Sequence, residues 1–414
     1  MPREQLETIQ LQRLQTTVRR LRERVPLMAE RLDGIANPSS LDDLAGLPFL
    51  KKSDLRDTYP FGLFASDRSD LARIHASSGT SGKPTVVGYT REDLSIWNEC
   101  VARCLRGAGV EPGWWLHNAY GYGLFTGGLG LHGGAEAAGI GVIPVSGGNT
   151  DRQLTLIEDF QPEAICCTPS YALTLAEKLA ERNQPNNSLR VGILGAEPWT
   201  EEMRQTIEER LDVIAVNIYG LSEVIGPGVS CETADRDGSV IMEDHFLPEV
   251  VDPESGEPVP DGEVGVLVLT SLTKQAFPVL RYWTGDLCSI TREPAPCGRT
   301  HVRMSAIVGR ADDMLVIRGV NVYPSQVEHT LLAVDGVSPH FQLVVNREGT
   351  LDTLTIRCET DGSDADHEAL ARTITADMQS SLGIGVGVSV EPEGSLPRSE
   401  GGKLSRIADK RSLS

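Results

Sequence analysis

The stretch "IHASSGTSGKPTVVGYT" (residues 74–90) gathers hydroxyl side chains and glycines ahead of a single lysine. Glycines let the backbone approach a ligand closely and adopt positive φ, and successive N–H groups and hydroxyls can line an anion-binding concavity. The residues expected to surround a phosphate are Ser77, Ser78, Gly79, Thr80, Gly82 and Lys83. This is not a Walker A loop, because Pro84 stands where that motif needs Ser or Thr. An ordinary surface turn is the alternative, so the prediction depends on the rest of the chain.

The composition limits the classes of protein to consider. The chain has 414 residues, 40% of them hydrophobic and 23% charged, which is typical of a globular protein with two or three domains. Its formal net charge of −20 disfavours nucleic acids and anionic membranes as partners. No apolar signal segment opens the chain, and no apolar run of about 18 residues predicts a membrane span. Eight scattered cysteines favour reduced thiols. We therefore expect a cytoplasmic protein.

The order of apolar patterns predicts a mixed α/β fold. Residues 3–25 are expected to form an amphipathic helix that ends at Pro26. From about residue 91, helical patterns alternate with short apolar strands, which predicts parallel sheets covered by helices. The segment from about residue 230 to about residue 310 is predicted to be rich in strands and turns, and a small α+β region is expected to follow. The predicted domains are a large N-terminal domain (residues 1–310), including this β-rich subdomain, and a small α+β C-terminal domain (residues 311–414).

Four further motifs follow the first stretch in a fixed order. They are "NIYGLSEVIGPG" (217–228), "RYWTGDL" (281–287), "GRADDMLVIRGVNVYPSQVE" (309–328) and "LPRSEGGKLSR" (396–406). Together these resemble the core motifs of the adenylate-forming superfamily of acyl-CoA ligases, adenylation domains and luciferases. Strings such as "AYGYGLFTGGLG", "CCTPSYAL", "GAEPWTEEMR" and "EDHF" are similar to those of the phenylacetate–CoA ligase family in particular. The resemblance spans nearly the whole chain, from about residue 3 to residue 410.

The resemblance implies a reaction in two halves. A carboxylate attacks the α-phosphate of ATP to give an acyl-adenylate and pyrophosphate, and the thiol of coenzyme A then displaces AMP. Both halves depend on positioning and charge stabilisation more than on a protein nucleophile. The implied substrate is phenylacetate, with ATP, Mg²⁺ and coenzyme A as the other participants and phenylacetate catabolism as the setting.

Roles for the nucleotide site follow from the resemblance. The 77–83 loop would hold the β- and γ-phosphates, Tyr219 would stack on adenine beside Gly220, and Ser222 would touch the α-phosphate. Glu223 would hold Mg²⁺, a hard cation that prefers carboxylate oxygens; a solvated acid at a helix start is the alternative. Residues lining the adenine and acyl pocket at a strand end would be Gly195, Ala196, Glu197 and Pro198.

The remaining implied roles involve the ribose, the hinge and the catalytic lysine. Asp286 would accept hydrogen bonds from the ribose hydroxyls, with Arg310 nearby, although an aspartate after glycine is often only a turn residue. Asp312 would be the hinge about which the small domain rotates between the half-reactions. Lys403 resembles the lysine that enters the site for adenylation; taken alone it reads as a surface lysine near the C-terminus.

The acyl pocket is expected around "AYGYGLFTGG", residues 119–128. Tyr120, Tyr122 and Phe125 offer apolar and aromatic walls for a flat aryl group, with glycines leaving room beside them. Packing in the protein core is an equally simple explanation of these aromatic residues. His245, in "EDHF", also matches the family and is assigned to the pocket without a definite role.

Two departures from the family pattern bear on ligands. Trp283 and Gly285 replace two arginines of the family's "RYRTRDL", which leaves the wider superfamily form intact. Some relatives carry zinc on cysteines and a histidine. Here Cys231 and Cys297 remain, while Ile241 and Ala295 occupy the other two places, so a closed four-ligand zinc site is not evident.

Three hypotheses remain open on the sequence alone. The leading one is an ATP-dependent aryl acid–CoA ligase acting on phenylacetate, with a homodimer suggested by relatives. The second is a stand-alone adenylation enzyme that loads an aryl acid onto a carrier protein in secondary metabolism. The third, a non-catalytic nucleotide-binding protein, is disfavoured by the intact motif residues Lys83, Glu223, Asp286, Asp312 and Lys403.

Overall fold

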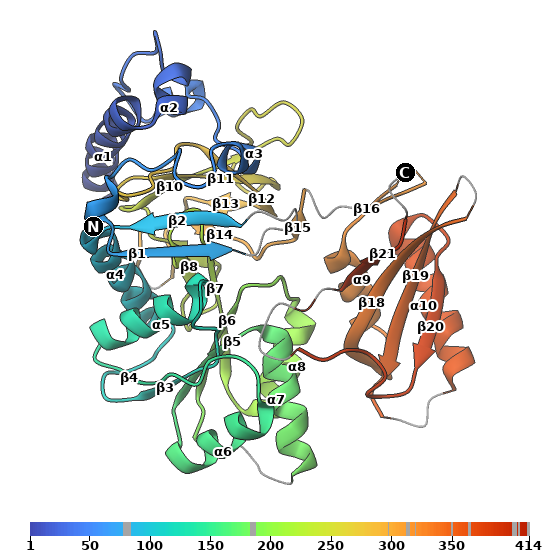
Figure 1. Cartoon of the computed structure of the whole chain (residues 1–414). Coiled ribbons are helices and arrows are strands. Elements are labelled where there is room, and N and C mark those ends of the chain that lie inside the picture. The colour runs from blue at the N-terminus through green and yellow to red at the C-terminus, as the bar shows by residue number, and fades with distance from the viewer. Residues whose placement is uncertain are drawn as a thin grey trace. The chain divides into compact units, whose positions relative to one another are not determined.

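A computed structural model of the 414-residue chain describes residues 1–77, 84–182, 188–296, 298–311, 315–318, 320–348, 351–362, 366–399, 404 and 406–411. It divides into two compact units, each made of several chain segments. Unit 1 comprises Met1–Cys167, Asn187–Ala196 and Val213–Ala306; unit 2 comprises Thr168–Asn186, Glu197–Asp212 and Ile307–Ser414. Figure 1 shows the elements of both units. The predicted α/β fold class is confirmed, and the predicted boundary between residues 310 and 311 stays a prediction.

A nine-stranded mixed sheet is the centre of unit 1, with the strand order β13-β14-β9-β8-β7-β6-β5-β3-β4. Its strands are β3 (Trp115–Asn118), β4 (Gly141–Ile143), β5 (Ala164–Cys167), β6 (Val191–Gly195), β7 (Ile214–Leu221), β8 (Gly226–Glu232), β9 (Ser239–Ile241), β13 (Ile290–Thr291) and β14 (Arg303–Met304). Neighbouring strands from β4 to β7 run parallel, whereas the pairs from β7 to β13 are antiparallel. Strands β5 and β6 are buried throughout, which explains their continuous apolar sequences.

Two smaller strand groups complete unit 1. The antiparallel pair β1 (Arg73–Ser77) and β2 (Thr85–Tyr89) flanks the hydroxyl-rich loop, with Ser77 opposite Thr85. A separate antiparallel sheet contains β10 (Phe246–Val251), β11 (Gly265–Ser271) and β12 (Tyr282–Cys288). The expected strand-rich region after residue 230 is therefore present.

The helices of unit 1 are α1 (Arg3–Arg24), α2 (Pro26–Arg31), α3 (Lys52–Asp57), α4 (Arg91–Gly107), α5 (Thr126–Ala137) and α6 (Thr150–Phe160), with short 3-10 turns at Asp42–Gly46 and Arg68–Asp70. Helix α1 matches the predicted amphipathic helix. The glycines of α5 let it pack closely on α4: a Cβ at Gly130 would lie 2.4 Å from the Trp97 ring, and one at Gly134 would lie 2.2 Å from Val101. These glycines make room for a neighbouring helix.

Unit 2 contains a four-stranded sheet in the order β20-β19-β18-β21, made of β18 (Val337–Glu348), β19 (Leu351–Thr360), β20 (Gly387–Glu391) and β21 (Ile407–Asp409). Helices α9 (Pro324–Leu332) and α10 (His367–Leu382) pack on this sheet around a core that includes Leu331, Ile356 and Ile374. The other elements are α7 (Pro169–Glu181), α8 (Glu201–Leu211), β15 (Gly309–Arg310), β16 (Leu315–Ile317) and β17 (Val320–Val322). No helix among the described residues is long and apolar enough to cross a membrane.

Candidate active site

The predicted phosphate loop joins β1 to β2. Ser77 ends β1, is partly buried, and pairs with Thr85 across the two strands. Ser78, Gly79, Thr80, Gly82 and Lys83 lie outside the described residues. The structure therefore places both ends of the loop, and the phosphate-binding roles of its residues stay predictions.

Two residues predicted to bind the nucleotide come together on β7 and β12. The hydroxyl of Tyr219 donates a hydrogen bond of 2.6 Å to Oδ2 of Asp286. Burial and the nearby charge of Asp286 raise the pKa of Tyr219, so the phenol stays protonated and serves as the donor. Gly220 lies where the β7–β8 turn is tightest, because a Cβ there would come within 1.9 Å of the carbonyl oxygen of Gly226. Any side chain at residue 220 would force β7 and β8 apart beside the Tyr219 ring.

Ser222 and Glu223 lie in the turn that follows β7. Oγ of Ser222 and Oγ1 of Thr126 are 3.0 Å apart, and both residues are buried. Thr126 opens helix α5, so this contact connects the turn to the "AYGYGLF" segment. Glu223 is only 8% exposed, and within the described part of the chain its carboxylate accepts no hydrogen bond or ion pair. A buried carboxylate has the right chemistry to bind a hard cation such as Mg²⁺.

The two tyrosines of the predicted acyl pocket have their hydroxyls engaged by the protein. Tyr120 donates a 2.6 Å hydrogen bond to the carbonyl oxygen of Cys167. The Tyr122 hydroxyl accepts from Nδ2 of Asn118 at 2.8 Å and lies 3.1 Å from Nδ1 of His132. Burial raises the pKa of Tyr122 well above its ordinary value. These rings therefore offer their faces and edges, rather than free hydroxyls, to whatever they contact.

Asn118 is a residue that the sequence analysis missed. Its side chain is fully buried at the end of β3, where it also donates to the carbonyl oxygen of Gly128 and accepts from the backbone N–H of Tyr120. One amide side chain thus holds both ends of the 120–128 segment. A polar residue closing the apolar strand "WLHN" was the only signal available in the sequence.

His245 lies in an ionic network. Its Nδ1 is 2.9 Å from Oγ1 of Thr273, and its Nε2 is 3.3 Å from the Arg103 guanidinium. Burial and the positive charge of Arg103 lower the pKa of His245 to about 4, although Asp244 acts in the opposite direction. His245 is therefore neutral near pH 7. Its assignment to the acyl pocket remains a prediction.

Potential metal ligands occur at two places. Glu99, Asp244 and His245 approach one another, but the Arg103 guanidinium contacts all three and supplies the positive charge there. At the second place, Cys231 forms a thiol–thiol hydrogen bond with Cys104 that, together with burial, raises the pKa of Cys104. Cys297 lies outside the described residues, so the zinc site stays a prediction.

The predicted "GAEP" residues begin at Gly195, the last residue of strand β6. A Cβ at Gly195 would lie 2.1 Å from the carbonyl oxygen of Ile218, so only glycine fits beside β7. Ala196 has a φ of 72°, a left-handed conformation that costs free energy for any residue with a Cβ. Strained backbone of this kind gathers at functional sites, which supports a ligand-facing role for this turn.

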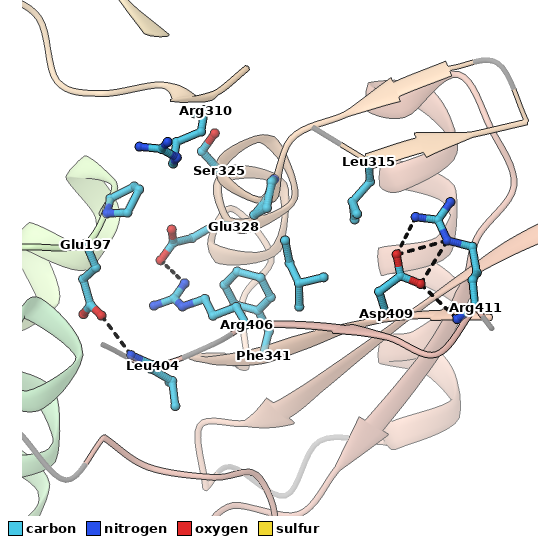
Figure 2. Close-up of a pocket in the computed structure, with 14 residues that line it drawn as sticks. Glu197, Arg310, Leu315, Ser325, Glu328, Phe341, Leu404, Arg406, Asp409 and Arg411 are labelled. Atoms are coloured by element: carbon cyan, nitrogen blue, oxygen red, sulfur yellow. Dashed lines mark hydrogen bonds and ion pairs between the residues drawn. The ribbon is translucent and has the colours of Figure 1, made fainter. Parts of the chain in front are cut away.

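Unit 2 contains a cavity of about 480 Å³ lined by three of the predicted site residues, Glu197, Pro198 and Arg310 (Figure 2). Glu197 accepts hydrogen bonds from the backbone N–H groups of Ser170 at 2.7 Å and Leu404 at 3.4 Å. Leu404 directly follows Lys403, which lies outside the described residues, as does Asp312. Glu197 and Leu404 therefore both line this cavity of unit 2.

Opposite charges surround this cavity. Arg406 forms a 2.6 Å ion pair with Glu328, and its guanidinium carbon lies 4.5 Å from the Phe341 ring centroid. Burial raises the pKa of Glu328, although Arg406 partly offsets this. Arg411 pairs with Asp409 at 2.5 Å on the cavity wall. The cavity wall therefore presents both carboxylates and guanidinium groups to a ligand.

Comparison with known proteins identifies the class. The AMP-binding enzyme family matches residues 47–273, and the AMP-binding enzyme C-terminal domain matches residues 319–411. The first match alone covers more than half of the chain, so the chain belongs to the AMP-binding enzyme family. A solved 2-hydroxyisobutyryl-CoA ligase, bound to 2-HIB-AMP in its postadenylation state, has a TM-score of 0.92 at 29% identity. That alignment covers 99% of this chain and 90% of the ligase.

Full-length relatives define the group within that class. A phenylacetate–coenzyme A ligase of Thermus thermophilus is 56% identical, with 99% of this chain and 98% of the relative covered. The corresponding ligase of Escherichia coli K12 is 49% identical over 99% of this chain and 96% of its own length. The resemblance to the phenylacetate–CoA ligase family noted from the sequence is confirmed.

Proposed function

We propose that the chain is an AMP-forming ligase that joins phenylacetate to coenzyme A at the expense of ATP. The observation that carries this proposal is identity of 46–56% to four phenylacetate–coenzyme A ligases over 97–99% of the chain. The substrates are therefore a small aryl acid, ATP and coenzyme A.

In the first half-reaction an oxygen of phenylacetate attacks the α-phosphorus of ATP, and pyrophosphate leaves. Ser77 to Lys83 hold the β- and γ-phosphates, while Ser222 contacts the α-phosphate. Lys403 places a positive charge between the acyl carboxylate and the α-phosphate, where charge develops in the transition state. The contact of Ser222 with Thr126 supports this arrangement, because it fixes the hydroxyl next to the turn that carries Glu223.

In the second half-reaction the thiol sulfur of coenzyme A attacks the acyl carbonyl carbon. The thiol loses its proton, the C–O bond to the phosphate breaks, and AMP leaves. Rotation of the C-terminal domain about Asp312 removes Lys403 from the site and admits the thiol. The same reaction centre is thus used twice with different parts of the chain around it.

The nucleotide and metal roles complete the proposal. Tyr219 presents its ring to adenine, and Asp286, which its hydroxyl contacts, accepts from the ribose with Arg310 nearby. Glu223 binds Mg²⁺, which neutralises phosphate charge when bound. The burial of its carboxylate, in the turn that also carries Ser222, supports this role.

The acyl site is proposed to be apolar around the aryl ring. Tyr120, Tyr122 and Phe125 surround the ring, and the hydroxyls of both tyrosines are already engaged. Such walls favour an unsubstituted ring over a hydroxylated one, because a ring hydroxyl would find no free partner on these tyrosines. His245 is assigned to this site without a definite role, and it lies within its network of Arg103 and Asp244.

Three features of the protein's setting belong to the proposal. The seven described cysteines are free and buried, which supports residence in a reducing compartment such as the cytoplasm. A homodimer is proposed by analogy with relatives. Zinc held by Cys231 and Cys297 is a further proposal, and Cys231 is buried next to Cys104.

The decisive experiment incubates the purified protein with ATP, Mg²⁺, coenzyme A and a panel of acids: phenylacetate, hydroxyphenylacetates, benzoate, anthranilate and short fatty acids. We expect AMP and phenylacetyl-CoA as products, with phenylacetate preferred. Pyrophosphate exchange without any thioester would overturn the proposal in favour of an enzyme that loads a carrier protein. A thioester made only from another acid would overturn the assigned substrate.

A further inference from the structure

We propose that Lys274 is a positioning residue for adenylation, because its ammonium group holds the backbone of the turn that carries Ser222 and Glu223. The inference rests on the proposed function, which assigns the α-phosphate and Mg²⁺ to these two residues. Lys274 follows strand β11 in the segment "TSLTKQAFP", which the motif analysis did not single out. Its role would be indirect, through the turn.

Lys274 is buried, with 3% of its surface exposed. Its Nζ donates a 2.8 Å hydrogen bond to the carbonyl oxygen of Val224, the residue after Glu223. The same ammonium lies 4.4 Å from the centroid of the Tyr89 ring and 5.5 Å from that of Phe277, both within cation–π range. A buried lysine is costly unless its charge is stabilised, and two rings and a carbonyl provide that stabilisation here.

Acidic groups complete the surroundings of Lys274. The negative charges of Asp93 and Glu223 favour its protonated form, whereas burial lowers its pKa to about 7. Asp93 is itself fully buried, and its carboxylate accepts from the backbone N–H groups of Gln275 and Ala276 at 2.6 and 2.9 Å. The segment that carries Lys274 is thus anchored to the start of helix α4, so its ammonium group is held in one place.

The Val224 contact is one of four that hold residues 222–227, the segment we call the turn. Thr126 contacts the Ser222 hydroxyl, the Tyr89 hydroxyl donates to the carbonyl oxygen of Ile225, and Trp97 Nε1 donates to that of Pro227. The last two distances are both 2.8 Å. Successive residues of the turn are therefore fixed from outside, and Lys274 supplies the contact adjacent to Glu223.

The same aromatic side chains adjoin the strand that leads into the phosphate loop. Tyr89 and Trp97 are stacked with ring centroids 4.9 Å apart. His75, on β1, packs edge-on against both, at 5.5 and 5.7 Å. The turn and the start of the phosphate loop thus share one rigid support, and displacing the turn would misalign the α-phosphate contacts relative to those for the β- and γ-phosphates.

A purely structural lysine and a positioning lysine predict different kinetics. Loss of a purely structural lysine would weaken folding and slow both half-reactions alike. Loss of a positioning lysine would slow adenylation and raise the Mg²⁺ requirement, because misplacement of reacting groups by about 1 Å can cost ~100-fold in rate. It would spare transfer of a preformed acyl group to coenzyme A.

The test compares Lys274→Met and Lys274→Arg with a matched control, Lys178→Met, at a lysine 45% exposed on α7. Adenylation is measured by pyrophosphate–ATP exchange across a range of MgCl₂ concentrations. The second half-reaction is measured by adding synthetic phenylacetyl-adenylate and coenzyme A. Unfolding midpoints report on the fold of each variant.

For Lys274→Met we expect adenylation to fall by ~10- to 100-fold. Half-saturating MgCl₂ should rise several-fold, while thioester formation from supplied adenylate stays within about threefold of the unmodified protein. Lys274→Arg, which keeps a cationic donor, should recover part of the loss, and Lys178→Met should match the unmodified protein. Equal losses in both half-reactions, or an unchanged Mg²⁺ requirement, would overturn the inference.

A second variant covers the case in which Lys274→Met does not fold. Tyr89→Phe removes only the hydroxyl that holds Ile225, so it should give the same pattern in weaker form; a variant with no shift in Mg²⁺ requirement would overturn the proposal. Failure of the unmodified protein to make phenylacetyl-CoA would instead refute the proposed function. The two failures are therefore distinguishable.

Discussion

The turn in unit 1 and the cavity in unit 2 are held by different forces. Residues 222–227 are fixed largely by hydrogen bonds from buried side chains to backbone carbonyls, whereas the cavity is bordered by ion pairs such as Glu328–Arg406 and Asp409–Arg411. In the first arrangement two of the three donors, the Tyr89 hydroxyl and the Trp97 indole, are uncharged. The second depends on charge and so responds to pH and to loss of a partner. Fixed geometry suits the role proposed for the turn, which is to position a nucleotide.

The largest expected effect tests which unit supplies the charge for adenylation. Lys403→Ala should reduce pyrophosphate exchange by on the order of 10³-fold, because it removes a cation placed where negative charge develops. Folding should be unchanged, and Lys410→Ala, at an exposed lysine nearby, is the matched control. Near-normal exchange in the Lys403 variant would defeat its assignment.

The ion pair at the cavity provides the next largest effect. Arg406→Met leaves Glu328 buried without its partner and should lower the free energy of unfolding of unit 2 by about 3–5 kcal/mol near neutral pH. The pKa of Glu328 is already raised by burial and should rise further. A carboxyl with a raised pKa in the folded state destabilises the fold as pH increases, so the loss should be greater at pH 8 than at pH 5.

Hydrogen exchange at α9 and β18 measures this loss in the full chain. The double variant Arg406→Met/Glu328→Met should recover much of the stability, because no charge is then left buried. Equal destabilisation at both pH values would contradict the role assigned to the pair.

Acid should weaken unit 1 before unit 2. The pKa of His117 falls from 6.5 to about 4 because of burial, only partly offset by its bond to Gln153. The unfolded chain therefore binds more protons between these values, and the stability is fully present above pH 6.5 and lost as pH falls towards 4. His117 should contribute roughly 3 kcal/mol to this loss, and His245 acts in the same direction.

Unit 2 offers the contrast. The pKa values of Glu177 and Glu359 are lowered from 4.5. Burial alone would raise both pKa values. The contacts of Glu177 with His340 and Arg398, and of Glu359 with Arg398, outweigh that effect. Their stabilisation is present above pH 4.5 and lost only below it. Hydrogen exchange between pH 7 and 5 should therefore weaken protection on β3 and β5 more than on β19. His117→Gln, which keeps a donor towards Gln153, should flatten the response of unit 1, and an unchanged slope would refute the assignment.

The smallest effect concerns one contact of the turn. Trp97→Phe removes the donor to the carbonyl oxygen of Pro227 and should cost about 1–2 kcal/mol of unfolding free energy. Trp115→Phe is the control, since that ring is 50% exposed. Urea denaturation compares the two, and equal midpoints would show that the Pro227 contact contributes nothing measurable.

Much of the fold could be predicted because its signals are local. The apolar runs "AICC" and "VGILG" become the buried parallel strands β5 and β6, and Pro26 follows closely on the end of α1. The motif order led to the family. The roles of Tyr219 and Asp286 were assigned separately, and the structure adds that the two residues touch.

Other features were hidden because they depend on distant partners. In the sequence, Lys274 resembles an ordinary polar residue of a turn. Only the folded chain brings it to Val224, fifty positions away. Gly130 and Gly134 of α5 were not singled out in the sequence, yet they admit Trp97 and Val101 of α4. Asn118 gave almost no signal, since its four contacts are made across a strand end and a loop.

The composition of unit 2 from separate segments has a consequence for synthesis of the chain. Helices α7 and α8 belong to the same compact unit as residues 307–414, and Glu177 on α7 bonds to His340 and Arg398. During translation these helices leave the ribosome long before those partners exist. A ribosome stalled before residue 307 would therefore hold a nascent chain in which Glu177 has Arg210 of α8, at 3.9 Å, but neither His340 nor Arg398. The two helices would be incompletely buried, which makes such a chain a substrate for chaperones.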